Sequence, residues 1–187
     1  VCGTTSSPGD GQGQDVYLIK TDQNGQETWS KTFGGSNSDE GYSVQQTNDG
    51  GFIITGRTQT DSPYYDVYLI KIDVNGIEQW SQTYGGSEFD VGYSVEQTGD
   101  GGFLIVGSSG EGGTALDAWI IKTDSEGELE WEENLGGEYA DIALSVLLTN
   151  DNGFIVSGYT HSYGNGSGDV WLIRYEGDGT STYSGPI

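Results

Sequence analysis

The hydrophobic positions of the chain fall into short runs that have neither the length nor the period of a helix. In one representative stretch, residues 41–47 alternate between polar and apolar side chains, and residues 52–56 form a short apolar run. Residues 66–72 are aromatic and β-branched, and residues 78–84 carry a tryptophan. A period of two over four to eight residues is typical of β-strands. The pattern therefore predicts four strands in this stretch and no helix.

Glycine and asparagine mark the connections between these strands. Residues 48–51 read Asn-Asp-Gly-Gly, and residues 73–76 read Asp-Val-Asn-Gly. Both residue types tolerate the positive φ that a tight hairpin requires. We therefore expect an antiparallel meander of four strands, with the tight turns at one end and the longer connections at the other.

The same four-strand unit recurs about every 51 residues. The run Asp-Val-Tyr-Leu-Ile-Lys-Thr-Asp at residues 15–22 returns in related form at residues 66–73, 117–124 and 169–176. Repeats of about 50 residues with four strands each are typical of the blades of a β-propeller. A solenoid is less favoured, because the coils of parallel β-helices are much shorter and lack paired hairpin turns.

We therefore expect one all-β domain over residues 1–187, a small β-propeller of four blades. The blade boundaries should lie near residues 1–38, 39–89, 90–140 and 141–187. Residues 1–38 supply only the second, third and fourth strands of a blade, so the first blade should lack its inner strand. An unpaired sheet edge is a template for another strand. The gap therefore predicts pairing with another molecule, unless the chain is part of a longer one.

A longer sequence pattern carries a family resemblance. Residues 34–53 read Gly-Gly-Ser-x-x-Asp-x-Gly-Tyr-Ser-Val-x-Gln-Thr-x-Asp-Gly-Gly-Phe-Ile, followed by Asp-Val-Tyr-Leu-Ile-Lys and then Asn-Gly-x-x-x-Trp. This pattern resembles the secreted β-propeller repeats of bacteria and archaea, of the SBBP type, over essentially the whole chain. The resemblance implies a propeller fold, an extracellular or cell-surface location and no particular chemistry.

Composition changes this picture mainly through charge. The chain has 29 acidic and 6 basic residues, a formal net charge of −23. Such a charge repels nucleic-acid phosphates and anionic membrane surfaces, so we expect no nucleic-acid partner. No stretch reaches the 18 or more apolar residues that a membrane span needs. Cys2 is the only cysteine and occupies a small-residue position of a strand, where we expect a buried thiol.

Residues repeated in every unit are assigned to folding. Lysine or arginine occurs at one repeat position, an acidic residue follows two positions later, and an aromatic residue recurs at a third position. These sets are Lys20, Lys71, Lys122 and Arg174; Asp22, Asp73, Asp124 and Glu176; and Trp29, Trp80, Trp131 and Tyr183. Residues two apart share one face of a strand, so we expect a local ion pair in each blade rather than a cationic binding ring. The aromatic residues should pack between blades rather than act as sugar platforms.

The loops at the other end of the strands differ from repeat to repeat, so they are the candidate binding or assembly face. The polar and aromatic candidates there are Asp61, Tyr64, Tyr65, Glu88, Phe89, Glu111, Tyr139, His161 and Tyr163. No catalytic residue is assigned, because His161 has no accompanying nucleophile and base at a recognisable spacing. Asp39 and Glu40 are weak calcium candidates, although the repeated Asp39, Asp90 and Asp141 more simply cap turns. No cofactor other than calcium is expected.

Three functions remain open at this point. The favoured hypothesis is a non-catalytic extracellular structural protein that binds copies of itself through the incomplete blade, as a filament, tube or surface layer. The alternative is a module that recognises a glycan or a cell-surface protein through the variable loops. A polysaccharide hydrolase or lyase is the least favoured hypothesis.

Overall fold

The computed structural model describes residues 1–6, 13–60, 63–110, 115–165, 167–176 and 181–184, and for residues 181–184 the backbone alone. Within these ranges the chain forms fifteen β-strands and no helix. The all-β prediction is confirmed. The same part of the chain accordingly holds no helix long and apolar enough to cross a membrane.

The strands form four antiparallel sheets in which consecutive strands are neighbours. The first sheet contains β1 (Cys2–Thr5), β2 (Asp15–Thr21) and β3 (Glu27–Phe33). The second contains β4 (Asp39–Gln46), β5 (Phe52–Gln59), β6 (Tyr65–Ile72) and β7 (Glu78–Tyr84). The third contains β8 (Asp90–Gln97), β9 (Phe103–Ser109), β10 (Asp117–Thr123) and β11 (Leu129–Leu135). The fourth contains β12 (Asp141–Leu148), β13 (Phe154–Thr160), β14 (Asp169–Tyr175) and β15 (Ser181–Ser184).

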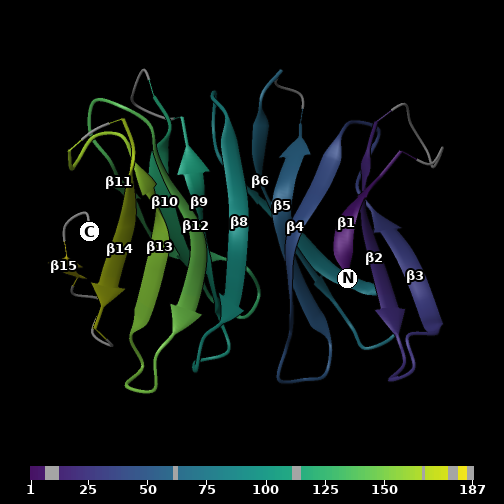
Figure 1. The fold of residues 1–187 in the computed structure, drawn as a ribbon. Helices are drawn as coiled ribbons and strands as arrows, with labels where there is room; N and C mark the ends of the chain where they lie inside the picture. Colours follow the sequence, from purple (N-terminus) through teal and green to yellow (C-terminus); the bar gives the residue numbers. More distant parts are fainter. Residues whose placement is uncertain (7–12, 61–62, 111–114, 166, 177–180, 185–187) are drawn as a thin grey trace.

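The predicted meander is confirmed, and the turn residues explain it. Gly50 and Gly76 have φ of 83° and 78° in the two hairpins of the second sheet, and Asn152 has φ of 65° in the fourth sheet. Glycine adopts this left-handed region without strain, and asparagine tolerates it better than most residues. Figure 1 shows these tight turns at the lower end of the sheets and the longer connections at the upper end.

The four sheets stand side by side in one row (Figure 1). Contacts join each sheet to the next: β1 and β2 contact β4, β5 contacts β8, and β9 contacts β12. The first and fourth sheets lie at opposite ends of the row (Figure 1). The described residues therefore show the predicted repeat of antiparallel sheets but no closed propeller.

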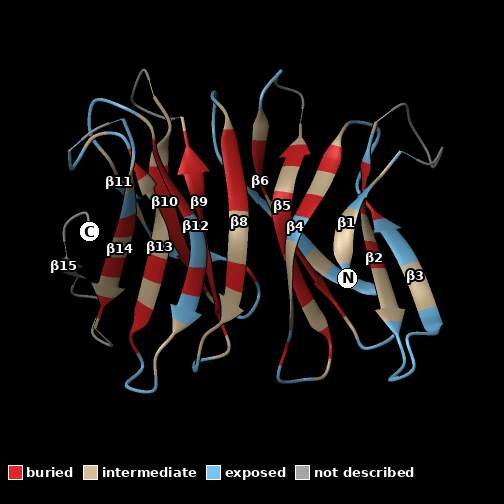
Figure 2. Cartoon of the chain, in the orientation of Figure 1, coloured by how far each residue is buried: buried red, intermediate tan, exposed pale blue. Residues whose placement is uncertain are grey.

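The core consists of the layers between neighbouring sheets. Ile53 packs in the layer between the second and third sheets, and Ile54 packs in the layer between the first and second. Side chains of a strand alternate between its two faces, so a sheet covered on both faces needs a continuous apolar run. Figure 2 shows the result, with buried residues concentrated in the middle strands of the internal sheets.

Each inner strand contains a β-bulge at the same repeat position. The register of β4 with β5 shifts between Gly41 and Ser43, so Tyr42 is an extra residue in the ladder. The extra residue is Tyr93 in β8 and Leu144 in β12. A bulge re-aims the side chain of the extra residue, so these three positions are released from the alternation of the strand.

Cys2 lies near the inner strand of the second sheet. Its thiol is half-buried rather than fully buried, and a side chain added at Gly41 would meet its Sγ atom. Burial raises the pKa of the Cys2 thiol to about 11, so the thiol is protonated at neutral pH.

Candidate functional site

The repeated aspartates at the start of the inner strands have a structural explanation. The Oδ2 atoms of Asp39, Asp90 and Asp141 accept hydrogen bonds from the backbone N–H groups of Gly35, Gly86 and Gly137. All three aspartates are buried. The predicted capping of the turn before each inner strand is confirmed.

The calcium candidates have other partners. Glu40 accepts hydrogen bonds from Arg57 and Tyr42, so both of its carboxylate oxygens are engaged. Within the part of the chain that the structure describes, no three His, Cys, Asp or Glu side chains come together in a way that could hold a metal ion. Calcium binding through Asp39 and Glu40 rests on the sequence alone.

The predicted ion pairs two residues apart are wrong in the internal sheets. Lys71 is buried, and its Nζ lies 2.8 Å from Asp49 Oδ2 and 2.9 Å from Gln79 Oε1. Asp73 instead accepts hydrogen bonds from the backbone N–H groups of Asn75 and Ile77. The carboxylate predicted to pair with the lysine therefore caps the hairpin turn.

The same exchange occurs in the third sheet, where Lys122 Nζ lies 3.0 Å from Asp100 Oδ2 and 2.8 Å from Glu130 Oε2 rather than pairing with Asp124. In the first sheet, Lys20 Nζ donates to the carbonyl of Val74, and Asp22 caps its own turn. The predicted pair exists only in the fourth sheet, between Arg174 and Glu176 at 3.1 Å.

The repeated tryptophans contact the neighbouring sheet. Trp29 meets Phe52 edge to face at 6.1 Å, and Trp80 meets Phe103 in the same way at 5.7 Å. Trp131 stacks on Phe154 at 6.4 Å. Each tryptophan is on an outer strand and each phenylalanine begins the second strand of the next sheet, which is the packing between blades that the sequence suggested. The side chain of Tyr183 lies outside the described residues.

The loop candidates do not form one cluster. Asp61 and Glu111 lie outside the described residues. Tyr139, His161 and Tyr163 belong to the loops around the fourth sheet, where Tyr139 N donates to Ser162 Oγ and His161 meets Tyr159 edge to face at 5.5 Å. Glu88 and Tyr64 are exposed on the loops of the second sheet. Among the described candidates, Tyr65 and Phe89 contact each other, with ring centroids 5.7 Å apart.

Tyr65 and Phe89 enclose an arginine that the sequence did not single out. The guanidinium carbon of Arg57 lies 4.3 Å from the centre of the Tyr65 ring and 5.4 Å from that of Phe89. Arg57 NH2 also lies 2.5 Å from Glu40 Oε1, its partner across the β4–β5 ladder. The arginine therefore combines an ion pair with cation–π contacts in one half-buried place.

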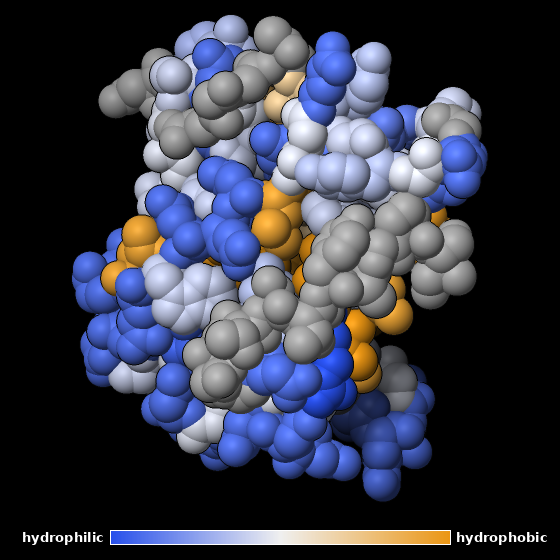
Figure 3. All heavy atoms as spheres, turned by 90° about the vertical axis from the view of Figure 1, so that its left-hand side faces the viewer, coloured by the Kyte–Doolittle hydropathy of each residue, from blue (hydrophilic) through white to orange (hydrophobic). Residues whose placement is uncertain are grey.

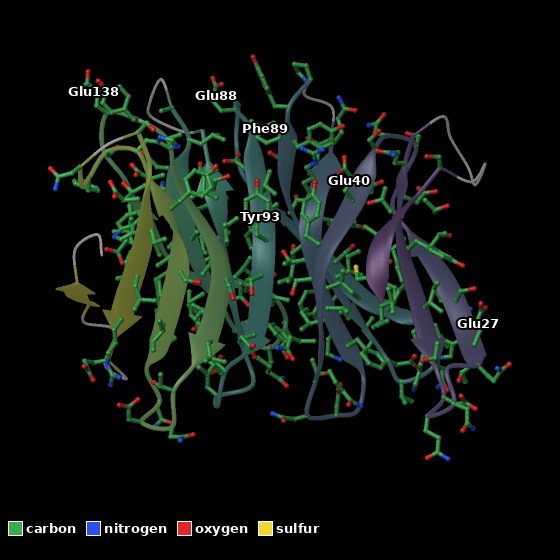
Figure 4. The ribbon with its side chains drawn as sticks, in the orientation of Figure 1. Glu27, Glu40, Glu88, Phe89, Tyr93 and Glu138 are labelled. Carbon is green, nitrogen blue, oxygen red and sulfur yellow. The ribbon has the colours of Figure 1, made fainter. Side chains whose placement is uncertain are left out.

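Two tyrosines extend this group onto the inner strands. Tyr42 Oη donates to Glu40 Oε2 at 2.6 Å, and the Tyr42 ring lies 5.7 Å from that of Tyr93. We call Glu40, Tyr42, Arg57, Tyr65, Phe89 and Tyr93 the Arg57 cluster. Figure 4 shows Glu40 and Tyr93 on neighbouring inner strands, with Phe89 in the loop above them.

The electrostatics of the Arg57 cluster follow from its hydrogen bonds. Burial alone would raise the pKa of Glu40, but the hydrogen bonds from Tyr42 and Arg57 outweigh burial and hold this pKa below its ordinary value. Burial and the hydrogen bond to Glu40 both raise the pKa of Tyr42. At neutral pH the cluster therefore contains the Glu40 carboxylate, the Arg57 guanidinium and the neutral phenol of Tyr42.

Sequence reasoning missed Arg57, Tyr42 and Tyr93 as site residues, although a signal existed for the first. Arg57 is one of only six basic residues, and four of the others occupy the repeated lysine position. A basic residue outside that position, in so acidic a chain, is an unrepeated feature. Tyr42 and Tyr93 gave no such signal, because they recur at the same position of consecutive repeats.

The two end faces of the row form a second candidate site. Val170 of β14 is 61% exposed, whereas Val67 and Ala118 at the same repeat position are each 1% exposed. Ile155 of β13 is half-buried, whereas its equivalent Leu104 is 1% exposed. Figure 3 looks onto this end of the molecule and shows hydrophobic side chains among hydrophilic ones. We call this surface the fourth-sheet end face.

The opposite end of the row carries the complementary repeat positions. Tyr17 and Ile19 of β2 are half-buried, whereas Ile70, the equivalent of Ile19, is 1% exposed and packs against the first sheet. Val1 is 82% exposed and aligns with the fully buried Ile54. We call Val1, Tyr17 and Ile19 the first-sheet end face.

Comparison of the chain with models of known protein families and with curated proteins gives no match.

Proposed function

We propose that this chain is a non-catalytic structural module that associates head to tail with copies of itself through its two end faces. The observation that carries the proposal is the exposure of side chains at the fourth-sheet end face whose equivalents are buried between the internal sheets. A packed interface of this kind already occurs three times within the chain.

The end faces are the two halves of that repeated interface. Between the second and third sheets, Ile53, Val67 and Leu69 face Val95, Ile105 and Ile121. The fourth-sheet end face presents the equivalents of the first set, and the first-sheet end face presents positions of the kind that face the preceding sheet. One copy's first sheet can therefore pack on another copy's fourth sheet as the third sheet packs on the second.

The energies involved favour covering these faces. Full burial of an aliphatic side chain such as valine or isoleucine contributes about 1.5–3 kcal/mol. A head-to-tail contact is heterologous, so it forms a ring where the rotation closes and a filament where it does not. Two copies in a ring would bring eight sheets together, twice the four blades predicted for one chain.

This contact differs from the one that the sequence first suggested, pairing of another strand at the edge of the incomplete first blade. Sheet-face packing uses side chains present at both ends of the row, whereas strand pairing uses the edge of β1 alone. The acidic composition and the resemblance to secreted repeats favour an extracellular or cell-surface setting, where salt screens repulsion between acidic copies.

The proposal is tested by light scattering on the purified chain in about 150 mM salt, over a range of protein concentrations. We expect a mass above that of one copy that rises with concentration. Val170→Asp and Ile19→Asp should each weaken association at least about tenfold, because each buries a charge in one half of the contact. Ile77→Asp, at a 62%-exposed turn position away from both end faces, is the matched control.

Mixing the two variants tests the head-to-tail geometry. The Val170→Asp protein keeps an intact first-sheet end face, and the Ile19→Asp protein keeps an intact fourth-sheet end face. Their mixture should therefore form a dimer through one intact contact, although each variant alone is monomeric. A wild-type chain that is monomeric at every concentration, or a mixture that stays monomeric, would refute the proposal.

A further inference from the structure

The Arg57 cluster consists largely of residues that the repeat does not require. Glu40, Arg57 and Phe89 are replaced at equivalent positions of the third repeat by Val91, Ser108 and Ala140. The fold therefore forms in another repeat without the arginine, its carboxylate and the phenylalanine. A group of unrepeated residues that converge from β4, β5, β6 and the β7–β8 connection calls for an explanation other than the repeat itself.

We propose that the Arg57 cluster is a binding site for a neutral saccharide, with Tyr42 and Tyr93 as the contact platform. The two rings are 5.7 Å apart with planes inclined by 36°, and Tyr42 is 40% exposed. Both residues are the extra residues of bulges, which turn their side chains out of the strand alternation. The apolar C–H face of a pyranose ring packs against such an aromatic surface.

The polar groups beside the platform fit sugar hydroxyls. Each carboxylate oxygen of Glu40 accepts one hydrogen bond within the cluster and has a second lone pair for a sugar hydroxyl, and Arg57 carries planar N–H donors. The Arg57 and Glu40 side chains are 23% and 15% exposed, so an approaching ligand can reach both. The Nε atom of Arg57 is buried without a protein partner among the described residues.

The cluster is also held in place before any ligand arrives. The Arg57 guanidinium is fixed by Glu40 at 2.5 Å and lies against the rings of Tyr65 and Phe89. Tyr42 is fixed through its hydroxyl to the same carboxylate. Preorganised side chains bind with a smaller loss of conformational entropy than mobile ones.

Local charge selects the chemical class of the ligand. The guanidinium of Arg57 and the carboxylate of Glu40 balance each other, whereas the whole chain carries −23. A cationic ligand would find stronger attraction almost anywhere else on the surface, and an anionic ligand would be repelled by the whole molecule. The Arg57 cluster has no net charge and an aromatic surface, so an uncharged ligand rich in hydroxyl groups is the class that it fits best.

The test is a glycan array with the labelled chain, followed by calorimetric titration of the best neutral glycan. We expect binding to at least one neutral glycan, and a loss of at least tenfold in affinity in Tyr42→Ala and in Tyr93→Ala. Tyr42→Phe keeps the ring and should retain most of the affinity. Tyr139→Ala, which removes a 57%-exposed tyrosine from a loop of the fourth sheet, should bind as the wild type.

Both platform positions lie outside the strand ladder, so we expect each variant to fold. Thermal unfolding of each variant checks this expectation. Binding of no neutral glycan, exclusive binding of charged glycans, or unchanged affinity in both alanine variants would overturn the proposal. These readouts are independent of self-association, because the platform lies on the second and third sheets and not on the end faces.

Discussion

At the residue scale, the glycines of the second strands show most directly why certain positions recur. A Cβ atom added at Gly56, Gly107 or Gly158 would lie 1.8 Å from the carbonyl oxygen of the opposite inner strand. Each of these glycines pairs with the residue just before the bulge. The repeated glycine and the bulge therefore occur together, because the absence of a side chain at the glycine lets the backbone of the inner strand approach the second strand closely.

We expect Gly107→Ala to lower the free energy of unfolding by about 1–3 kcal/mol, the usual cost of forcing extra atoms into a packed place. Urea denaturation of the purified chain measures the change. Gly99→Ala is the matched control, because a Cβ atom at Gly99 would meet nothing within 4 Å. Equal stabilities of the two variants would contradict the close approach.

The buried lysines give a pH prediction. Burial would raise the pKa of Asp100, but hydrogen bonds from Thr98, Lys122 and the backbone of Gly102 lower it to about 2. A carboxyl group whose pKa is lower in the folded state stabilises the fold above its unfolded pKa, near 4. That contribution is lost as the pH falls through the folded pKa, that is, between about pH 4 and pH 2.

The Asp100→Asn variant should therefore lose less stability than the wild type between pH 4 and pH 2, and the two should differ most at neutral pH. The melting temperature as a function of pH measures this difference. Glu132→Gln, at an exposed carboxylate of β11, serves as the control for removing one negative charge. Parallel curves for the wild type and Asp100→Asn would show that the ion pair contributes nothing to stability. The difference should be small, because the Asp100 side chain is 59% exposed and solvent screens the ion pair.

At the element scale, the strands could be predicted because apolar periodicity and turn residues agree in every repeat. The ion-pair partners of the lysines could not be predicted. Two carboxylates are near each lysine in the repeat, and a sequence does not show which carboxylate is already hydrogen-bonded to the backbone. Asp73 is already engaged by the backbone of its own turn, and this leaves Lys71 to Asp49. The Arg57 cluster escaped prediction because Glu40 and Arg57 are neighbours only through the register of the β4–β5 ladder. Tyr93 then joins them from the next sheet and Phe89 from the connection between the two sheets.

The contact of each tryptophan with the next sheet makes a prediction about how the elements hold together. Trp80 packs on Phe103, and a Cβ atom added at Gly127 would lie 2.8 Å from its ring. We expect Trp80→Ala to destabilise the chain by about 3 kcal/mol, and Trp80→Phe to have a smaller effect. Leu129→Ala, at a 49%-exposed position of β11, is the control for an apolar truncation outside this contact. A loss for Trp80→Ala no larger than the control's, in chemical denaturation, would argue against the tryptophan as a link between sheets.

At the scale of the whole molecule, charge opposes both folding and assembly. With a net charge of −23, the chain repels itself over the Debye length, which falls from about 30 Å at 10 mM salt to about 8 Å at 150 mM. We expect the melting temperature and the mass in light scattering both to rise over this range of sodium chloride. Calcium chloride at matched ionic strength separates screening from a specific site, because an additional rise with calcium alone would support the candidates Asp39 and Glu40. A melting temperature that falls with salt would contradict self-repulsion.

The number of sheets and their order could be read from the repeat, but the form of the row could not. Whether four sheets close on themselves depends on how side chains fill the layers between neighbouring sheets. Trp119 and Trp171 are large members of two of these layers, and the pattern along the chain does not show how they pack. The repeat pattern predicts a buried residue at position 170, but Val170 is 61% exposed in the part of the chain that the structure describes.

The bulge in each inner strand also has a consequence for which substitutions the sequence can accept. A residue outside the ladder can be replaced without disturbing the hydrogen bonds on either side of it, and the occupants already differ, with tyrosine at positions 42 and 93 and leucine at 144. The inner strand of each of these three repeats thus contains one position where the fold tolerates substitution. A library of substitutions at the three bulge positions should therefore yield a much larger share of folded proteins than a library at the neighbouring Gly41, Gly92 and Ala143.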